Sequence, residues 1–253
     1  ALSCVPQVWK ATRLSARWVL GFLSFYGLMK GGVFGLVLVH EQQWGGLSLT
    51  LFIFATTILI GFPLAIMLAL LRNSSLPWIS GATGLVIDII RSLPMLSILF
   101  MFAIVLPFML PSILIGEKLY RVIASFALYF AAYQAEIIRG GLQSIPKGQS
   151  EAAQALGLQY RYRMLHVLLP QAMRSALPAT INQIVVCFME TSLVVIVGFF
   201  DVLASGNAAY RTAEWTFAFV EVYVFVGGIY FLFSFLLSSY GAYLERRMSQ
   251  GGP

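Results

Sequence analysis

Charged residues are scarce in this sequence. Only 10% of its 253 residues are Asp, Glu, Lys or Arg, whereas 59% are hydrophobic, and an average soluble domain is about 25% charged. The two cysteines, Cys4 and Cys187, are too few for a disulfide framework, and the histidines His40 and His166 show no metal-ligand spacing. Alternating segments of about ten residues, typical of an outer-membrane barrel, are missing too. The composition therefore argues against a soluble domain and favours a helical membrane protein.

Long uncharged runs support that class. Residues 47–71 and 92–116 carry no charge over 25 positions each, and a helix of about 20 apolar residues crosses the hydrocarbon layer while satisfying its own backbone. We predict an all-α integral membrane protein. Six transmembrane helices are expected, at 18–39, 47–71, 85–110, 119–138, 176–200 and 216–244.

The first predicted span has an alternative interpretation. Lys30 interrupts it, and a basic start before a short apolar core is also typical of a signal peptide. As a span, it would carry Gly27, Gly31 and Gly35 as a stripe for close helix packing. Because the chain does not begin with methionine, we expect residues 1–42 to be part of a longer N-terminal segment.

The basic residues predict the orientation. With the N-terminus in the cytoplasm, eleven lysines and arginines fall in inner segments and three in outer ones, the bias typical of cytoplasmic loops. The net charge of +6 then marks these loops and not a nucleic-acid surface. The inner set is Lys10, Arg13, Arg17, Arg72, Arg139, Lys147, Arg161, Arg163, Arg174, Arg246 and Arg247, and the outer set is Lys118, Arg121 and Arg211.

One charged segment, EAAQALGLQYRYRMLHVLLPQA at 151–172, interrupts the apolar pattern on the predicted inner side. Pro146 suits the start of a helix, and Gly157 suits a left-handed helix end. We predict one short helix over 150–156 and a second over 160–169 that ends at Pro170. By itself this pattern also fits an amphipathic connector lying on the membrane.

The spacing of this segment resembles the EAA-x3-G-x9-[IV]-x-L-P motif of ABC importer permeases. The matching residues are Glu151, Ala152, Ala153, Gly157, Val167, Leu169 and Pro170. In that family the loop forms the coupling helix, which docks on a cytoplasmic ATPase. The resemblance implies the same role here, and a five-helix type I importer core preceded by one extra helix.

Other motifs are similar to those of the polar amino-acid permeases. They are Trp44-Gly45-Gly46-Leu47, Arg91-Ser92-Leu93-Pro94, Ala135-Glu136-Ile137-Ile138-Arg139-Gly140-Gly141 and Ile145-Pro146-Lys147-Gly148-Gln149. Glu190-Thr191-Ser192-Leu193-Val194 resembles K-D-T-S-L-V, with Met189 in place of lysine and Glu190 in place of aspartate. The resemblance is to the M-type subunits of the general L-amino-acid group. It implies a permease domain at 43–247, an N-terminal segment with the extra helix at 1–42, and a cytoplasmic tail at 248–253.

Charged and polar residues within the spans are candidates for a second role, because ionisable groups at membrane depth usually face protein or water. Glu136 and Arg139 are spaced to form a structural ion pair on one helix face, and Asp88 and Arg91 have the same spacing. Because Pro94 would break the helix just after Arg91, a bent helix facing a polar path is the alternative to a structural pair of Asp88 and Arg91. For a polar translocation path we select Arg91, Pro94, Asn182, Gln183, Glu190, Thr191 and Ser192.

The resemblance implies a membrane permease subunit of an ATP-driven amino-acid importer, without catalytic residues, metal or cofactor of its own. ATP and Mg²⁺ would bind a separate ATPase, since the sequence has no G-x4-G-K-[ST] loop. Expected partners are a second permease, preferably in a heterodimer, two ATPase subunits, an external binding protein and the lipid bilayer, with no nucleic acid. The expected location is a bacterial inner membrane, with both termini cytoplasmic. Alternatives are an opine or cystine permease, a lone secondary transporter, or an intramembrane enzyme.

Overall fold

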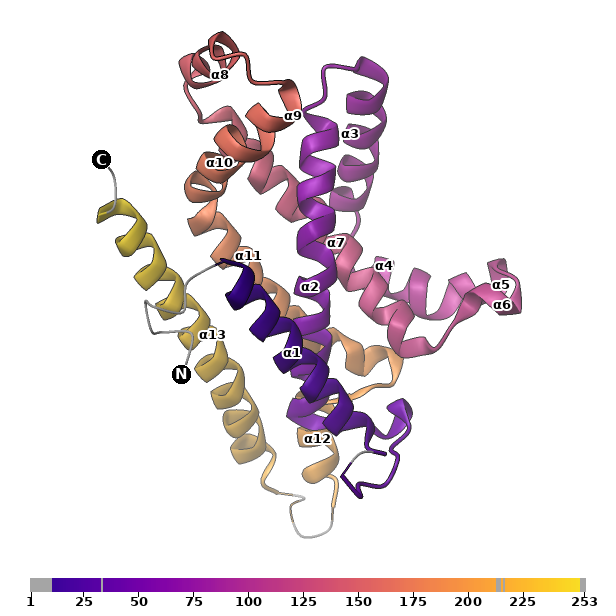
Figure 1. Cartoon of the computed structure of the whole chain (residues 1–253). Helices are drawn as coiled ribbons and strands as arrows, with labels where there is room; N and C mark the ends of the chain where they lie inside the picture. Colours follow the sequence, from indigo (N-terminus) through magenta and orange to yellow (C-terminus); the bar gives the residue numbers. More distant parts are fainter. Residues whose placement is uncertain (1–10, 33, 213–214, 216, 251–253) are drawn as a thin grey trace.

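The computed structural model in Figure 1 describes residues 11–32, 34–212, 215 and 217–250. Cys4, together with residues 1–10 of the predicted N-terminal segment and 251–253 of the predicted tail, lies outside them. Helices make up nearly all of the described chain. They are α1 (Ala11–Lys30), η3 (Glu41–Gln43), α2 (Gly46–Arg72), α3 (Pro77–Ser92), α4 (Met95–Phe100), η4 (Met101–Val105), α5 (Leu106–Met109), α6 (Ser112–Ile115), α7 (Lys118–Gln143), α8 (Lys147–Ala155), α9 (Tyr160–Tyr162), η5 (Arg163–Leu168), α10 (Leu169–Ser175), α11 (Leu177–Glu190), η6 (Thr191–Val197), α12 (Val202–Ala209) and α13 (Phe219–Gln250), with one two-residue strand, β1 (Phe200–Asp201).

Helix α7 is the centre of the fold. It contacts α2 along much of its length and also contacts α3, α4, α10 and α11. Two apolar clusters form on it: one around Phe52, Phe126 and Leu99, and one around Ile87 and Ile138. Helices α2, α3, α10 and α11 are therefore positioned by their packing on α7, whereas α13 packs on α11 and α12.

In the part of the chain that the structure describes, three helices are long and apolar enough to cross a membrane: Gly46–Arg72, Leu177–Val197 and Phe219–Arg247. The bent pair Pro77–Ser92 and Met95–Met109 would make a fourth span among the described residues. The chain is thus a multi-pass helical membrane protein, but the predicted count of six spans is not confirmed. Helix α7 is long enough to span, and its surroundings of protein explain why its sequence is less apolar.

The first predicted span, 18–39, is wrong in its second half. Helix α1 ends at Lys30, because Gly31 and Gly32 adopt left-handed conformations (φ +71° and +76°) that no helix continues. Gly31 and Gly35 therefore lie outside the helix, and Gly27 has no neighbour within packing distance of an added Cβ. The predicted glycine packing stripe does not exist.

The predicted span 85–110 begins later than the observed helix and is divided by a bend. Helix α3 already begins at Pro77 and ends at Ser92, and the chain then turns by 102° into the helical stretch Met95–Met109. Pro94 is the residue before α4, with extended backbone (φ −61°, ψ 140°). Its ring and missing N–H explain why the helix ends there, as predicted from the sequence.

The two ends of the molecule differ (Figure 1). Helix α8, the start of α3 and the C-terminal end of α13 lie at one end, which we call the α8 end. At the opposite end, β1 pairs in parallel with Gly45 and Gly46, just at the start of α2. The backbone N–H of Val202 donates to Thr50 Oγ1 at 3.2 Å, which holds α12 against α2.

Helix α10 approaches α7 at backbone distance. A Cβ placed on Gly141 would lie 2.4 Å from the carbonyl oxygen of Ala172, closer than any side chain allows. Gly140, the preceding residue, has no atom within 4 Å of an added Cβ. Only the second glycine of this pair is therefore required by packing, and it lets the two helices touch.

We expect Gly141→Ala to lower the melting temperature of the purified protein in detergent, because it overpacks this contact at a cost of about 1–3 kcal/mol. Gly140→Ala is the matched control, and it should be neutral or stabilising by about 0.5–1 kcal/mol. Equal melting temperatures for the two variants would contradict a close α7–α10 contact.

Candidate functional site: the α8–α10 loop

The segment with the EAA spacing folds as two helical arms joined at Gly157. The first arm is α8, which follows Pro146, and the second arm is α9, η5 and α10 in succession. Together, residues 146–175 form what we call the α8–α10 loop, at the end of the molecule seen at the top of Figure 1. The predicted break between two short helices at Gly157 is thus present in the structure.

Gly157 makes this turn through its left-handed conformation (φ +76°). The N–H of Leu158 donates to the Ala153 carbonyl at 3.2 Å, and the N–H of Gly157 donates to the Gln154 carbonyl at 2.9 Å. These two bonds form a Schellman motif, which satisfies the last carbonyls of α8 and reverses the chain sharply. A residue with a Cβ would strain the same turn.

The second arm does not end at Pro170, contrary to prediction. It passes through the π-helical turn η5 (Arg163–Leu168) and continues as α10 to Ser175. Pro170 lies in the first turn of α10, where a missing N–H costs little. The wider π turn shifts the hydrogen-bond register just before the proline, so the helix continues across it.

Few residues hold the arms to each other. Arg163 Nη1 donates to Gln154 Oε1 at 2.8 Å, and Gln171 Nε2 donates to Gln149 Oε1 at 3.4 Å. Ala153 on the first arm and Met164 on the second are buried. Val167 and Leu169 are half-buried, whereas Glu151, Ala152 and Pro170 are exposed. The motif residues therefore divide into a set that builds the loop and a set that stays on its surface.

An unusual apolar surface surrounds the turn. Leu156 is 81% exposed and Tyr162 is 56% exposed, with Leu158 and Tyr160 also exposed between them. These residues lie on a charged loop outside the long apolar helices. An exposed apolar patch of this kind marks a contact surface for a protein partner or for the membrane interface. Together with Glu151, these four residues make the tip of the loop.

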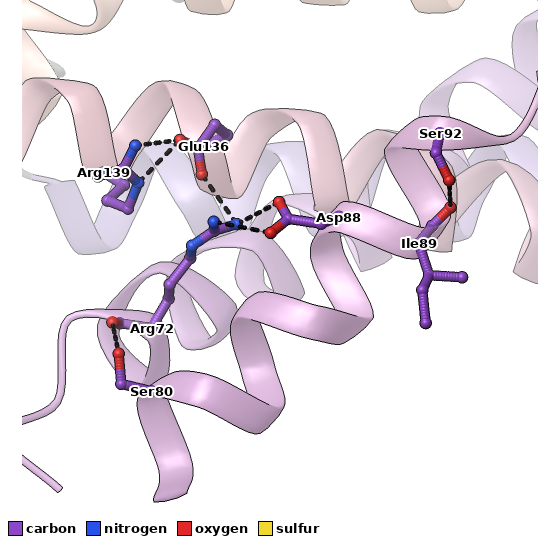
Figure 2. Close-up of polar contacts among 7 residues, drawn as sticks. All are labelled: Arg72, Ser80, Asp88, Ile89, Ser92, Glu136 and Arg139. Atoms are coloured by element: carbon purple, nitrogen blue, oxygen red, sulfur yellow. Dashed lines mark hydrogen bonds and ion pairs between the residues drawn. The ribbon is translucent and has the colours of Figure 1, made fainter. Parts of the chain in front are cut away.

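A charged cluster lies where α2, α3 and α7 meet (Figure 2). Glu136 accepts a hydrogen bond from Arg139 Nε at 2.8 Å and a second one from Nη2. The predicted partner of Asp88 was Arg91, and that prediction is wrong. Asp88 pairs with Arg72, by two hydrogen bonds of 2.9 and 3.1 Å.

Arg91 faces a different partner. Its guanidinium lies 5.3 Å from the ring centroid of Tyr133, and its carbonyl accepts the Tyr133 hydroxyl at 3.1 Å. Pro94, one turn further along, is exposed. Both residues are thus at the bend between α3 and α4.

The other residues selected for the path do not share one environment. Thr191 is fully buried and Gln183 is 9% exposed, whereas Asn182 is exposed and Ser192 is half-buried. The hydroxyls of Thr191 and Ser192 donate to carbonyls three residues earlier. Glu190 is half-buried and forms no ion pair within the described residues. The assignment of these residues to a path stays a prediction.

Sequence reasoning missed two buried polar contacts and one cation. Gln134 Nε2 donates to Thr180 Oγ1 at 2.7 Å, linking α7 to α11. Asp201 is fully buried and accepts from the Ala204 N–H at 2.9 Å, and burial raises the pKa of its carboxyl. The missed cation is Arg72, which the prediction counted only as a loop charge. Its position at the end of a long apolar helix, where a cation complements the helix dipole, was the available signal.

Residues 61–250 match the family described as "Binding-protein-dependent transport system inner membrane component". The chain belongs to this family. It is the permease subunit of an ABC importer, with the type I importer permease fold predicted from the EAA spacing. The α8–α10 loop lies entirely inside the matched range.

Individual relatives agree with the family. The permease is 38% identical to the inner membrane amino-acid ABC transporter permease protein YhdY of Escherichia coli, over 99% of this chain and 70% of that protein. It is 37% identical to the glutamate/glutamine/aspartate/asparagine transport system permease protein BztC of Rhodobacter capsulatus, over 84% of this chain and 49% of that protein.

Solved structures have the same fold. A crystal structure described as an amino acid ABC transporter with histidines has a TM-score of 0.69 at 30% identity, over 80% of this chain and 92% of that chain. An inward-facing structure of the MetNI methionine ABC transporter has a TM-score of 0.60 at 20% identity, over 79% and 91% of the two chains. The second likeness concerns the fold alone.

We predict that Gly157→Ala loosens the turn of the loop, because a left-handed residue with a Cβ costs about 1–2 kcal/mol. Hydrogen exchange of the backbone amides at positions 157 and 158, measured in the wild type and in the variant, reports the loosening of the turn. Exchange should become about tenfold faster, as a change of 1.4 kcal/mol implies.

Gly148→Ala is the control for this variant. Gly148 lies within α8 and has no atom within 4 Å of an added Cβ. Exchange at residues 157 and 158 should then stay at the wild-type rate. Unchanged exchange in Gly157→Ala as well would show that the turn does not depend on the glycine.

Proposed function

We propose that this permease imports amino acids together with a second permease, two ATPase subunits and an external binding protein. The observation that carries the proposal is the tip of the α8–α10 loop, which presents Glu151 and exposed apolar residues outside the long apolar helices. A partner that covers this patch would stabilise it, and the EAA resemblance supports a cytoplasmic ATPase as that partner. ATP and Mg²⁺ would bind the ATPase and not this chain.

The orientation in a bacterial inner membrane follows from the same loop. If the α8–α10 loop meets a cytoplasmic ATPase, the C-terminal end of α13 lies on the cytoplasmic side as well, because both are at the α8 end (Figure 1). Arg246 and Arg247 near that end agree with the enrichment of basic residues on the inner side. The N-terminus is proposed to be cytoplasmic on the same charge bias.

The substrate class rests on the relatives. YhdY, BztC and the glutamate/aspartate import permease GltK of Escherichia coli are named for amino acids. A second candidate is cystine, since the L-cystine transport system permease TcyL of Bacillus subtilis is 30% identical over 81% of this chain. Uptake into proteoliposomes distinguishes the two candidates. A radiolabelled mixture of the common L-amino acids and cystine are measured in separate assays.

We expect Glu151→Lys to abolish coupling, since it reverses the charge at the tip of the loop. The complex of both permeases and the ATPase is purified, and ATPase co-purification and binding-protein-stimulated ATP hydrolysis are measured. Stimulation should fall about tenfold or more, in the range typical of couplings between distant sites. Gly157→Pro should act in the same direction, because proline cannot adopt the left-handed conformation of this turn.

Glu245→Lys is the control, with the same charge change on α13 at the same end of the molecule. It should leave stimulation near the wild-type value. If Glu151→Lys and Gly157→Pro both hydrolyse ATP like the wild type, the loop is a surface connector, and the proposed coupling function is wrong.

The proposed translocation path makes a separate prediction. Glu190 lies half-buried near the end of α11 without an ion-pair partner among the described residues, and an acid at membrane depth usually serves transport. Glu190→Leu should lower amino-acid uptake while the ATPase still co-purifies. Glu190→Gln keeps the shape and some polarity and should be less affected. Wild-type uptake in Glu190→Leu would remove this residue from the path.

A further inference from the structure

Arg72 joins three helices at the α8 end of the molecule (Figure 2). From the last turn of α2, its guanidinium binds both carboxylate oxygens of Asp88 on α3, at 2.9 and 3.1 Å. Its Nη1 also lies 3.2 Å from Oε2 of Glu136 on α7. Because a bidentate arginine–carboxylate pair fixes orientation as well as distance, this side chain adds a directional contact among α2, α3 and α7 to the apolar packing of α3.

The residues on the face of α3 that packs against α2 lie close to Arg72. Ser80, Gly84 and Asp88 follow one another at intervals of four residues, so they share one face of the helix. The Ser80 hydroxyl donates to the Arg72 carbonyl at 2.6 Å, and a Cβ on Gly84 would lie 3.7 Å from Arg72 Nε. Arg72 therefore covers this face over two turns.

The contact between α7 and the α8–α10 loop differs from the charged contact at Arg72. Gly141 brings the backbones of α7 and α10 into direct contact, and the hydroxyls of Ser144 and Ser175 lie 2.8 Å apart. Close-packed backbone contacts of this kind transmit displacement without giving way. A movement of the loop is consequently passed to α7 as a rigid unit.

The joint between α7 and α3 can rearrange. The side chain of Asp88 is 57% exposed and that of Arg72 is 20% exposed, and an ion pair with access to water exchanges its partners at little cost. Arg139 holds the same Glu136 carboxylate from the other side. Glu136 thus has two arginine partners, one on its own helix and one on α2.

The far end of α3 leads to the bend of 102° before α4. Arg91 and Tyr133 connect α3 to α7 next to this bend, through the cation–π contact and the hydroxyl–carbonyl bond described above. A shift of α3 relative to α7 changes the direction of the chain at Leu93 and Pro94. The bent pair is therefore the element that a movement at Arg72 would redirect.

We propose that Arg72 is a positioning residue for transport, which passes movement of the α8–α10 loop from α7 to the bent helix pair. This inference rests on the proposed coupling function and names a residue that the EAA motif does not contain. Asp88 and Glu136 are the two contacts through which Arg72 acts.

The test uses the whole transporter, with both permeases, the ATPase and the binding protein in proteoliposomes. Arg72→Met keeps the length of the side chain and removes its charge. The readout is the amount of a radiolabelled mixture of the common L-amino acids taken up per ATP hydrolysed. This ratio should fall about tenfold, as expected for the loss of coupling between distant sites, while the ATPase still co-purifies.

Three further variants make the result specific. Arg72→Lys retains a charge without the bidentate geometry, so its ratio should lie between those of the wild type and Arg72→Met. Asp88→Asn should lower the ratio too, and the double variant with Arg72→Met should be no worse than Arg72→Met alone. Arg211→Met, which changes an exposed arginine two residues after the end of α12, should leave the ratio unchanged. Helix α12 lies at the end of the molecule opposite to the α8 end (Figure 1).

The outcomes separate the two proposals. A purely structural role for Arg72 would reduce the yield of complex, while the complex that forms keeps the wild-type ratio, and this result would overturn the inference. A wild-type ratio in Arg72→Met at full yield would overturn it as well. If the proposed coupling function itself is wrong, the variants of the α8–α10 loop will leave ATP hydrolysis and assembly of the complex intact.

Discussion

The permease depends on how closely other helices can approach α7. Hydrocarbon chains are as apolar as leucine, so helices in a bilayer gain little by hiding apolar surface from one another and associate through close packing and hydrogen bonds. Small residues on α7, among them Ala127, Ala131 and Ala135, are buried against its neighbours. On α2, a Cβ at Gly61 would lie 2.8 Å from the Phe130 ring. The position of α2, α3 and α10 follows from these contacts.

The contacts between helices in this packing differ in stiffness. Glycine contacts, such as the one at Gly141, hold the α8–α10 loop to α7 without room for adjustment. The contact between α7 and α3 relies on charged side chains that water can reach. A transporter needs two discrete arrangements of its helices, and packed surfaces that slide or hinge only at defined places supply them. In the proposed mechanism, the charged contact between α7 and α3 is such a place.

The α8–α10 loop has little stability of its own. Its arms are joined by one Schellman turn and by two side-chain hydrogen bonds, Arg163–Gln154 and Gln171–Gln149, and much of its apolar surface is exposed at the tip. Its orientation comes from α10, which lies against α7. The loop therefore presents a partly preformed surface to its partner, and preformed surfaces pay less ordering entropy on binding.

The sequence alone determined the class of the protein, the EAA loop, the turn at Gly157 and the break near Pro94. These features depend on local chemistry: apolar runs, the missing N–H of proline, and the freedom of glycine at positive φ. The sequence also predicted six spans and a helix through Gly31, and it left an ion pair between Asp88 and Arg91 as one alternative. Within the described residues the count of six is not confirmed, and the helix through Gly31 and the Asp88–Arg91 pair are absent. Only the tertiary structure decided that Asp88 pairs with Arg72 and that Glu136 joins them. Asp88 and Glu136 lie 16 and 64 positions after Arg72 in the sequence. The packing of α2, α3 and α7 brings these residues together, whereas helical spacing predicts only neighbours about one turn away on the same helix.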